Sequence, residues 1–430
     1  MLKIHAISLG CPKNRVDTER ALGSLGRVRM LDQPGRADLL FINTCAFILP
    51  AVEESVRTVL EAAARRQARK RRPLLAVAGC LVGRYGAGAL AGNLPEVDLW
   101  LDNRELQHWP ALLARALGRE QSEPGRLLST GPSYAWLKLG DGCRHACAFC
   151  TIPAIRGAQR SHGLEELARE ARFLLDRGVR ELALVAQDLT AWGQDLGGRK
   201  GLADLLERLL RLEGNFWLRL LYLYPAGIRP RFLAFMREFS SEERLLPYFD
   251  IPLQHAHPDI LAKMGRPFAR DPRRVTDAVR AHLPDAALRT SLIAGFPGET
   301  ERHFARLRDF VAETRFDHLG VFAYSPEEGT PAARMPGQVP KALREERRAE
   351  LMELQAGISA EKLRALEGRR MRVLVDGAHP EWPGLHVGRV WLQAPEIDGL
   401  TYVSGPGAQP GAMVEAEITE SREYDLIALA

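Results

Sequence analysis

The sequence predicts an α/β protein with an N-terminal doubly wound α/β domain, a central β/α barrel that is partial or complete, and a small C-terminal antiparallel β-barrel. Short apolar runs alternate with amphipathic helical segments through most of the chain, as parallel sheets covered by helices require. Beyond residue 366, short β-like runs separated by Gly and Pro replace this alternation, which is typical of a small barrel. The predicted parts are 1–106 for the first domain, 107–133 for a linker, 134–340 for the central domain, 341–366 for a connecting helix and 367–430 for the barrel.

Three of the six cysteines share one placement in the first domain, because each directly follows a short apolar run of the buried-strand type. They are Cys11 after 4–10, Cys45 after 39–44 and Cys80 after 74–79. Helical segments over 16–25 and 52–67 separate these runs, which predicts a parallel sheet. Because ligand sites of such sheets gather outside the carboxyl ends of the strands, we expect the three thiols to converge on a metal cluster. Three unrelated buried thiols are the alternative.

The most informative pattern is a second cysteine cluster, Cys143, Cys147 and Cys150, which follows a predicted strand over 134–139. Its C-x3-C-x2-C spacing provides three thiolates, and three thiolate ligands leave one iron of a four-iron cluster open to a small molecule. A structural zinc site needs four ligands, and two-cluster ferredoxins use a different spacing. A zinc knuckle or three unrelated buried thiols are the alternatives.

The central domain continues as alternating strands and helices. Strands are predicted over 181–186, 218–223, 248–253, 289–294 and 319–324, with amphipathic helices over 164–177 and 202–212. Since active groups of β/α barrels lie at the carboxyl ends of strands, Gln187 and Gln254 are candidate cofactor or substrate contacts. Phe149, just before the third cysteine, is a further candidate, with ordinary core packing as its alternative. His255 and His257 are expected to be structural residues rather than ligands.

The rest of the chain consists of a long charged helix over 341–366 and β-like runs over 371–375, 387–392, 401–404 and 413–420. From 371 to 430 it contains nine acidic residues and three arginines. A barrel that binds RNA phosphates should be basic, so this acidity favours a basic protein partner; a merely solvated acidic surface is the alternative. The basic run 65–72, in contrast, is either a solvated helix end or a contact surface for an anionic partner.

The composition favours a soluble globular protein of several domains, because the 430 residues are 46% apolar and 26% charged. No run of about 18 apolar residues is present, so no membrane span is expected, and the N-terminus leads into a strand rather than a signal peptide. We therefore expect a cytoplasmic protein whose cysteines remain reduced. The net charge of +5 suggests an acidic or nucleic-acid partner.

Taken in order, these parts resemble the methylthiotransferase family of radical S-adenosylmethionine (SAM) enzymes. That family has an N-terminal domain with one 4Fe–4S cluster on three cysteines, a radical SAM domain with a second cluster on C-x3-C-x2-C, and a C-terminal TRAM β-barrel. Four strings are similar to the branch that modifies small-subunit ribosomal protein S-twelve: SLGCPKN at 8–14, DIPLQH at 250–255, YSPEEGT at 324–330 and APEIDG at 394–399. The last of these is the most specific to that branch.

The resemblance implies that Cys143, Cys147 and Cys150 hold the cluster that binds and cleaves SAM. It implies that the cluster of the first three cysteines carries the sulfur that becomes a methylthio group on the β-carbon of an aspartate of ribosomal protein S-twelve. The expected cofactors are therefore two 4Fe–4S clusters and SAM. An electron donor such as a flavodoxin or ferredoxin is the second expected partner, and RNA contact is expected only through the ribosome. Phe149 is expected to pack near the adenine of SAM.

Two other functions fit part of this pattern. Sibling branches of the family methylthiolate an adenosine of transfer RNA, which is the same chemistry on another substrate. A non-catalytic iron–sulfur carrier would use the same cysteines without cleaving SAM.

Overall fold

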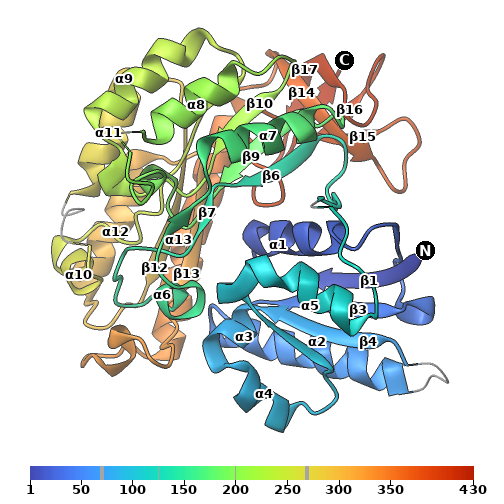
Figure 1. Ribbon diagram of the computed structural model, residues 1–430. Helices are drawn as coiled ribbons and strands as arrows, with labels where there is room; N and C mark the ends of the chain where they lie inside the picture. The colour runs from blue at the N-terminus through green and yellow to red at the C-terminus, as the bar shows by residue number, and fades with distance from the viewer. Residues whose placement is uncertain (68–71, 124, 199, 267–270) are drawn as a thin grey trace.

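The computed structural model describes residues 1–67, 72–123, 125–198, 200–266 and 271–430, and it has the three bodies that the sequence predicts (Figure 1). The N-terminal domain, coloured blue to cyan, lies beside α6 (Ile152–Arg156) of the central domain, where α3 (Cys80–Tyr85) contacts that helix. The C-terminal barrel, in red, lies near β10 (Trp217–Leu220). Among the described residues, no helix is both long enough and apolar enough to cross a membrane.

The N-terminal domain is a parallel sheet in the order β2-β1-β3-β4-β5, with helices on both faces. The strands are β1 (Leu2–Ser8), β2 (Val28–Met30), β3 (Leu39–Thr44), β4 (Leu74–Gly79) and β5 (Leu99–Asp102), and the helices are α1 (Pro12–Gly23), α2 (Leu49–Gln67), α3, α4 (Ala87–Asn93) and α5 (Trp109–Ala116). Alternate side chains of β3 enter different cores: Leu40 and Ile42 pack with α2, whereas Leu39 and Phe41 pack with α1 and α5. The doubly wound arrangement is therefore confirmed.

The predicted linker does not lack structure at its start. Residues 109–116 form helix α5, with Trp109 and Leu113 almost completely buried against the sheet. The sequence gives only a short apolar repeat here, and a Pro follows Trp109, so the helix depends on this tertiary packing rather than on a long periodic pattern. Farther along, Arg126 forms buried ion pairs with Glu19 at 2.7 Å and Glu170 at 2.8 Å, which fixes the segment between the two domains.

The central domain is an open six-stranded parallel sheet in the order β13-β12-β11-β10-β9-β6, so the predicted barrel is partial. Its strands are β6 (Tyr134–Lys138), β9 (Glu181–Val185), β10, β11 (Leu245–Asp250), β12 (Ala287–Ala294) and β13 (His318–Ala323), and a short antiparallel pair, β7 (Gly140–Asp141) and β8 (Arg160–Ser161), flanks the cysteine loop. Its helices are α6, α7 (Leu164–Leu175), α8 (Leu202–Leu210), α9 (Pro230–Glu238), α10 (Pro258–Lys263), α11 (Pro272–His282), α12 (Glu301–Thr314) and α13 (Lys341–Arg364). The connecting helix α13 belongs to this body, because Leu351 and Ile358 enter its core.

The C-terminal body is a closed barrel in the order β14-β15-β16-β18-β17, formed by β14 (Arg370–Ala378), β15 (His386–Val390), β16 (Thr401–Ser404), β17 (Met413–Ser421) and β18 (Leu426–Leu429). The pairs are antiparallel apart from β16 with β18, which is parallel. Barrel residues such as Val373 share one apolar cluster with Trp136 and Trp217 of the central sheet. The barrel therefore covers part of the central sheet.

Candidate active site

Cys11, Cys45 and Cys80 converge at the carboxyl edge of the N-terminal sheet, as predicted. Cys11 directly precedes α1, Cys45 follows β3, and Cys80 is the first residue of α3. Gly10 has a φ of +83°, and a Cβ added there would lie 2.7 Å from the Sγ of Cys45. The charge of each thiolate acts on the others, because Cys11 and Cys80 both raise the pKa of Cys45. A glycine is therefore required at position 10, because any side chain there would prevent Cys45 from approaching the backbone next to Cys11.

The three thiols of this first triad differ in their electrostatic surroundings. Burial, followed by the charge of Cys80, raises the pKa of Cys45 to about 12. Burial would also raise the pKa of Cys11, but the charges of Lys13 and Arg156 reverse that effect and lower it below its ordinary value. A metal cluster binds thiolates and provides the positive charge that keeps them deprotonated. Cys11 is thus the thiol that is most easily ionised before a cluster binds.

Cys143, Cys147 and Cys150 form the second triad on the loop between β7 and α6. The backbone N–H of His145 donates to the Sγ of Cys143 over 3.4 Å, and the N–H of Cys150 donates to the carbonyl of Cys147 over 3.1 Å. Burial, together with the charges of Cys147 and Cys143, raises the pKa of Cys150 to about 12. The three thiols of this loop therefore lie close enough for their charges to interact, and the cluster that they are expected to hold stays a prediction.

The ends of two neighbouring strands hold this cysteine loop. His145 bonds through Nε2 to the Oδ2 of Asp188 over 2.7 Å, and its ring stacks on Tyr224 with centroids 3.6 Å apart. Asp188 follows β9, and Tyr224 follows β10. Gly142 has a φ of +69°, and a Cβ added there would overlap the carbonyl oxygen of Ala158. The loop conformation is thus defined on one side by strand-end contacts and on the other by a glycine.

A buried network of charges connects the two triads. Arg156 forms ion pairs with Asp141 at 2.8 Å and with Asp17 of α1 at 3.2 Å. Lys138 bonds to the same two carboxylates, at 2.8 Å to Asp141. The side chain of Arg156 also donates to Asn14, three residues after Cys11. Burial alone would raise the pKa of Asp141, but Lys138 and Arg156 lower it well below its usual range. The network therefore binds α1 of the first domain to the cysteine loop of the second.

Gln187 and Gln254 lie at the carboxyl ends of central strands, as predicted. Gln187 follows β9, and neither its Oε1 nor its Nε2, both buried, has a hydrogen-bond partner among the described residues. An unpaired buried amide is costly, so a polar ligand would satisfy it. Gln254 has a φ of +71°, an uncommon conformation for a residue other than glycine. Its backbone N–H donates to Ser291 over 2.8 Å, so the strained residue is fixed against β12.

Phe149 is half-buried beside the second triad. Its ring meets Phe296 edge-on with centroids 6.5 Å apart and packs in a small apolar cluster with Tyr324. Arg266 lies over the Phe149 ring at 6.0 Å. These contacts show packing of the ordinary core type on one side of the ring, and the role of the ring toward SAM stays a prediction.

Several residues near the triads had no distinct signal in the sequence. Arg156, Asp188 and Tyr222 look like ordinary members of helices and strand ends, and only the fold places them here. Tyr222 has a φ of +61°, which marks the end of β10 as strained. Their nearness to a cysteine in the sequence could have identified two cations as candidate site residues, because Lys13 follows Cys11 by two residues and Arg156 follows Cys150 by six.

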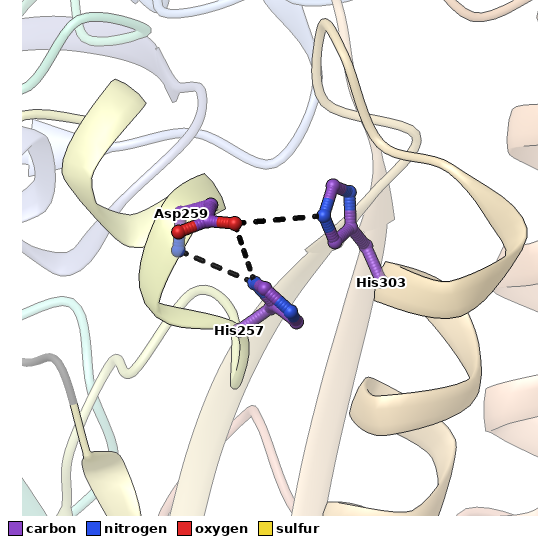
Figure 2. A group of neighbouring side chains, drawn as sticks. All are labelled: His257, Asp259 and His303. Atoms are coloured by element: carbon purple, nitrogen blue, oxygen red, sulfur yellow. Dashed lines mark hydrogen bonds and ion pairs between the residues drawn. The ribbon is translucent and has the colours of Figure 1, made fainter.

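His257, Asp259 and His303 form a separate group of potential metal ligands at the starts of α10 and α12 (Figure 2). The Nδ1 of His257 accepts from the N–H of Asp259 over 3.2 Å, and the Nδ1 of His303 accepts from the N–H of Thr300 over 3.1 Å. Both imidazoles therefore satisfy free N–H groups of helix N-termini. His255 lies nearby, buried, with Nε2 bonded to Glu299 at 3.1 Å. The prediction that His255 and His257 are structural agrees with these contacts.

The donor sets fit the cofactors that the sequence implies. Each triad offers three thiols and no nearby fourth cysteine, which suits a four-iron cluster with one open iron better than a closed zinc site. The amide of Gln187, which has no partner among the described residues and precedes Asp188, offers both a donor and an acceptor to a polar small molecule such as SAM.

Comparison with known proteins supports this interpretation. Residues 3–102 match uncharacterized protein family UPF0004, residues 137–311 match the radical SAM superfamily, and residues 368–430 match the TRAM domain. Among solved structures, the radical SAM methyltransferase TsrM from Kitasatospora setae, with cobalamin and a [4Fe–4S] cluster bound, is similar in fold. It has a TM-score of 0.56 and 14% identity, and the match covers 90% of this chain and 80% of that one.

Full-length relatives are much more similar. The ribosomal protein uS12 methylthiotransferase RimO of Nitratidesulfovibrio vulgaris (strain Hildenborough) is 65% identical, over 100% of both chains. The proteins of the same name from Lawsonia intracellularis and Syntrophus aciditrophicus are 54% and 46% identical, over 100% and 99% of this chain and 98% and 97% of theirs. This chain therefore belongs to the ribosomal protein uS12 methylthiotransferase family of radical SAM enzymes.

Proposed function

We propose that this protein adds a methylthio group to the β-carbon of an aspartate of ribosomal protein uS12, the small-subunit protein S-twelve. The observation that carries the proposal is the pairing of two three-thiol sites at adjoining sheet edges, connected through Asp17, Asp141 and Arg156. The identity of the full-length relatives supports uS12 as the substrate. A one-electron donor such as a flavodoxin or ferredoxin would complete the system.

In this proposal the two triads have different tasks. Cys143, Cys147 and Cys150 would hold the cluster that binds SAM, and Cys11, Cys45 and Cys80 would hold the cluster that carries the added sulfur. The chemistry supplied by the bound groups is reductive cleavage of SAM and hydrogen abstraction from an unactivated carbon, which side chains alone cannot perform. The protein's own residues would bind these groups and fix their separation.

Four features of the chain suit that positioning task. The Arg156 network holds the two cysteine-bearing segments together, and the contact of His145 with Asp188 orients the second loop. Gln187 is proposed to bind a polar group of SAM or of the substrate, because its amide atoms have no other described partner. Gln254 is proposed to contact the same ligands through the strained backbone at the end of its strand.

Some acidic side chains of the C-terminal barrel are paired with residues of the other two bodies, so fewer of them are available to a partner than the sequence suggests. Asp398, in the APEIDG string, accepts from the hydroxyl of Tyr248 over 2.6 Å and pairs with Arg289 at 3.3 Å. Glu396 of the same string pairs with Arg15 of α1. The string that is most specific to the uS12 branch thus attaches the barrel to the other two bodies. The proposed protein substrate therefore rests mainly on the relatives, and the remaining exposed acids make the barrel a poor surface for RNA phosphates.

A competition reaction tests the proposed function. The protein would be reconstituted anaerobically with iron and sulfide and supplied with SAM, a reductant, uS12 and unmodified transfer RNA together. Mass spectrometry of both substrates should find a methylthio gain on an aspartate of uS12 alone. A gain on adenosine would instead assign the protein to the transfer-RNA reaction, and the absence of any SAM cleavage would leave an iron–sulfur carrier.

A further inference from the structure

Lys13 is a buried lysine that has no carboxylate partner among the described residues. The residue is 7% exposed, and its Nζ lies 3.4 Å from the carbonyl oxygen of Ala186 and 3.8 Å from the centroid of the Tyr222 ring. Within the described part of the chain, no carboxylate forms an ion pair with it. Lysines are rarely buried unless they are paired, because an uncompensated charge in the interior is costly.

Lys138 is a second buried lysine, and its partners differ from those of Lys13. It is 1% exposed and bonds to two carboxylates, those of Asp17 and Asp141. Lys13 has instead a carbonyl and the face of an aromatic ring, which together neutralise a charge only in part. Its positive charge is therefore available to an anion that arrives with a ligand.

The position of Lys13 identifies where that anion would lie. Lys13 follows Cys11 of the first triad by two residues, and it contacts Ala186 at the end of β9. The next two residues along the chain are Gln187, whose amide atoms have no described partner, and Asp188, which holds the loop of the second triad through His145. The ammonium group thus lies where the first domain meets the strand end that supports the second triad.

We infer that Lys13 binds the carboxylate of the substrate aspartate. It would thereby select an acidic side chain of a protein over the uncharged adenine base of a transfer RNA. This inference rests on the proposed function. The reacting β-carbon of an aspartate is bonded directly to its carboxylate carbon, so a fixed carboxylate also fixes the carbon that loses hydrogen. A buried ammonium with unused donors is suited to this role, because hydrogen bonds to charged groups are stronger than neutral ones. An adenosine offers no anionic group next to its reacting carbon.

The carboxylate of SAM and the thiolates of the first triad are the other anions within reach of such a group, and Lys13 does lower the pKa of Cys11. The test must therefore separate substrate, SAM and cluster. It uses the reconstituted enzyme and two labelled uS12 peptides, one with the target aspartate and one with asparagine in its place. Binding of each peptide is measured anaerobically by fluorescence anisotropy without reductant, for the wild type, Lys13→Gln, Lys13→Arg and the charge-matched control Lys3→Gln.

The wild type and Lys3→Gln are expected to bind the aspartate peptide about 10- to 100-fold more tightly than the asparagine peptide. Lys13→Gln should lose this preference by weakening only the aspartate peptide, and Lys13→Arg should retain most of it. Iron and sulfide content, the electron paramagnetic resonance signals of both clusters, and SAM affinity by equilibrium dialysis are measured on the same preparations.

Equal weakening of both peptides by Lys13→Gln would overturn the inference, because it would indicate a general structural effect. Loss of iron from one cluster would assign Lys13 to the first triad, and loss of SAM affinity would assign it to SAM. Failure of the proposed function is recognised by a separate result. If the wild-type enzyme modified transfer RNA and not uS12, an aspartate would not be the substrate, and the inferred role of Lys13 would fail for that reason.

Discussion

Arg156 and Asp141 form a buried ion pair of 2.8 Å that joins the two ends of the second cysteine loop. Asp141 precedes Cys143 by two residues, and Arg156 follows Cys150 by six. The same guanidinium reaches Asp17 of α1 at 3.2 Å. One side chain therefore sets both the closure of the loop and its attachment to the domain that carries the first triad.

Replacing Arg156 by Gln should destabilise the protein by about 3–5 kcal/mol, because it leaves the buried carboxylates of Asp17 and Asp141 with Lys138 as their one ion-pair partner in the described part of the chain. Chemical denaturation of the cluster-free protein measures this change in the free energy of unfolding. Arg211→Gln is the matched control, since Arg211 forms an exposed pair with Glu207 on the surface of α8 and its neighbouring turn, and we expect no measurable change there. Similar midpoints for the two variants would show that the buried network does not stabilise the fold.

His255 should make stability depend on pH. Burial lowers the pKa of this histidine below its ordinary value of 6.5, and the bond to Glu299 offsets the effect only in part. The unfolded chain therefore binds a proton at a higher pH than the folded protein does. The stabilising contribution of neutral His255 is complete above about pH 6.5 and is lost as the pH falls from there toward the lowered pKa.

This pH dependence is measured as the free energy of unfolding between pH 7.5 and 5.5, with His255→Gln as the comparison. The decline toward acid should be shallower in the variant, because it has lost the group that takes up a proton on unfolding. A decline of the same slope in both proteins would assign the pH dependence to other groups, such as the buried carboxylates.

Gly142→Ala should disrupt the second triad. Gly142 has a φ of +69°, and an added Cβ would overlap the backbone of Ala158. Gly178→Ala is the control, since Gly178 follows α7 with a φ of +87° and an added Cβ there has nothing within 4 Å among the described residues, so it meets backbone strain alone. Iron content after reconstitution should fall by one cluster in Gly142→Ala and remain near the wild-type value in Gly178→Ala. Equal iron in both variants would show that the loop tolerates the displacement.

Asp398→Asn should loosen the C-terminal barrel from the central domain. The carboxylate of Asp398 pairs with Arg289 and accepts from the hydroxyl of Tyr248, and both contacts cross between the two bodies. Limited proteolysis should cut the variant faster between α13 and the barrel, whereas Glu417→Gln, at an exposed position of β17, should behave like the wild type. Unchanged cleavage of Asp398→Asn would mean that the shared apolar cluster alone holds the barrel.

The sequence was sufficient to predict the two thiol triads because their signals are local. A cysteine after a buried strand, or three cysteines on one loop, can be recognised without knowing the neighbours. The buried partners could not be predicted in this way, because the pairing of Arg156 with Asp17 joins residues 139 positions apart. Lys13 is visible in the sequence beside Cys11. That no described carboxylate pairs with it depends on all the segments that pack around it, which the sequence does not show.

Strand β18 and helix α5 were not predicted, because each depends on contacts with distant parts of the chain. Strand β18 follows a short polar turn and contains few residues, so its pairing with β16 and β17 is decided by closure of the barrel rather than by its own pattern. Helix α5 was assigned to a linker because its formation depends on packing of Trp109 and Leu113 against the N-terminal sheet rather than on its own sequence pattern. Part of the predicted basic run, residues 68–71, lies outside the described residues, whereas Arg66 at its start pairs with Asp98 at 2.6 Å.

The division of labour between the triads is tested most directly by measuring two products in one reaction. 5′-Deoxyadenosine and methylthiolated uS12 would be quantified together for the wild type, Cys147→Ala and Cys45→Ala, each reconstituted with iron and sulfide. We predict that Cys147→Ala forms neither product, and that Cys45→Ala still cleaves SAM but gives no methylthiolated uS12. Methylthiolation of uS12 by Cys45→Ala would contradict the account.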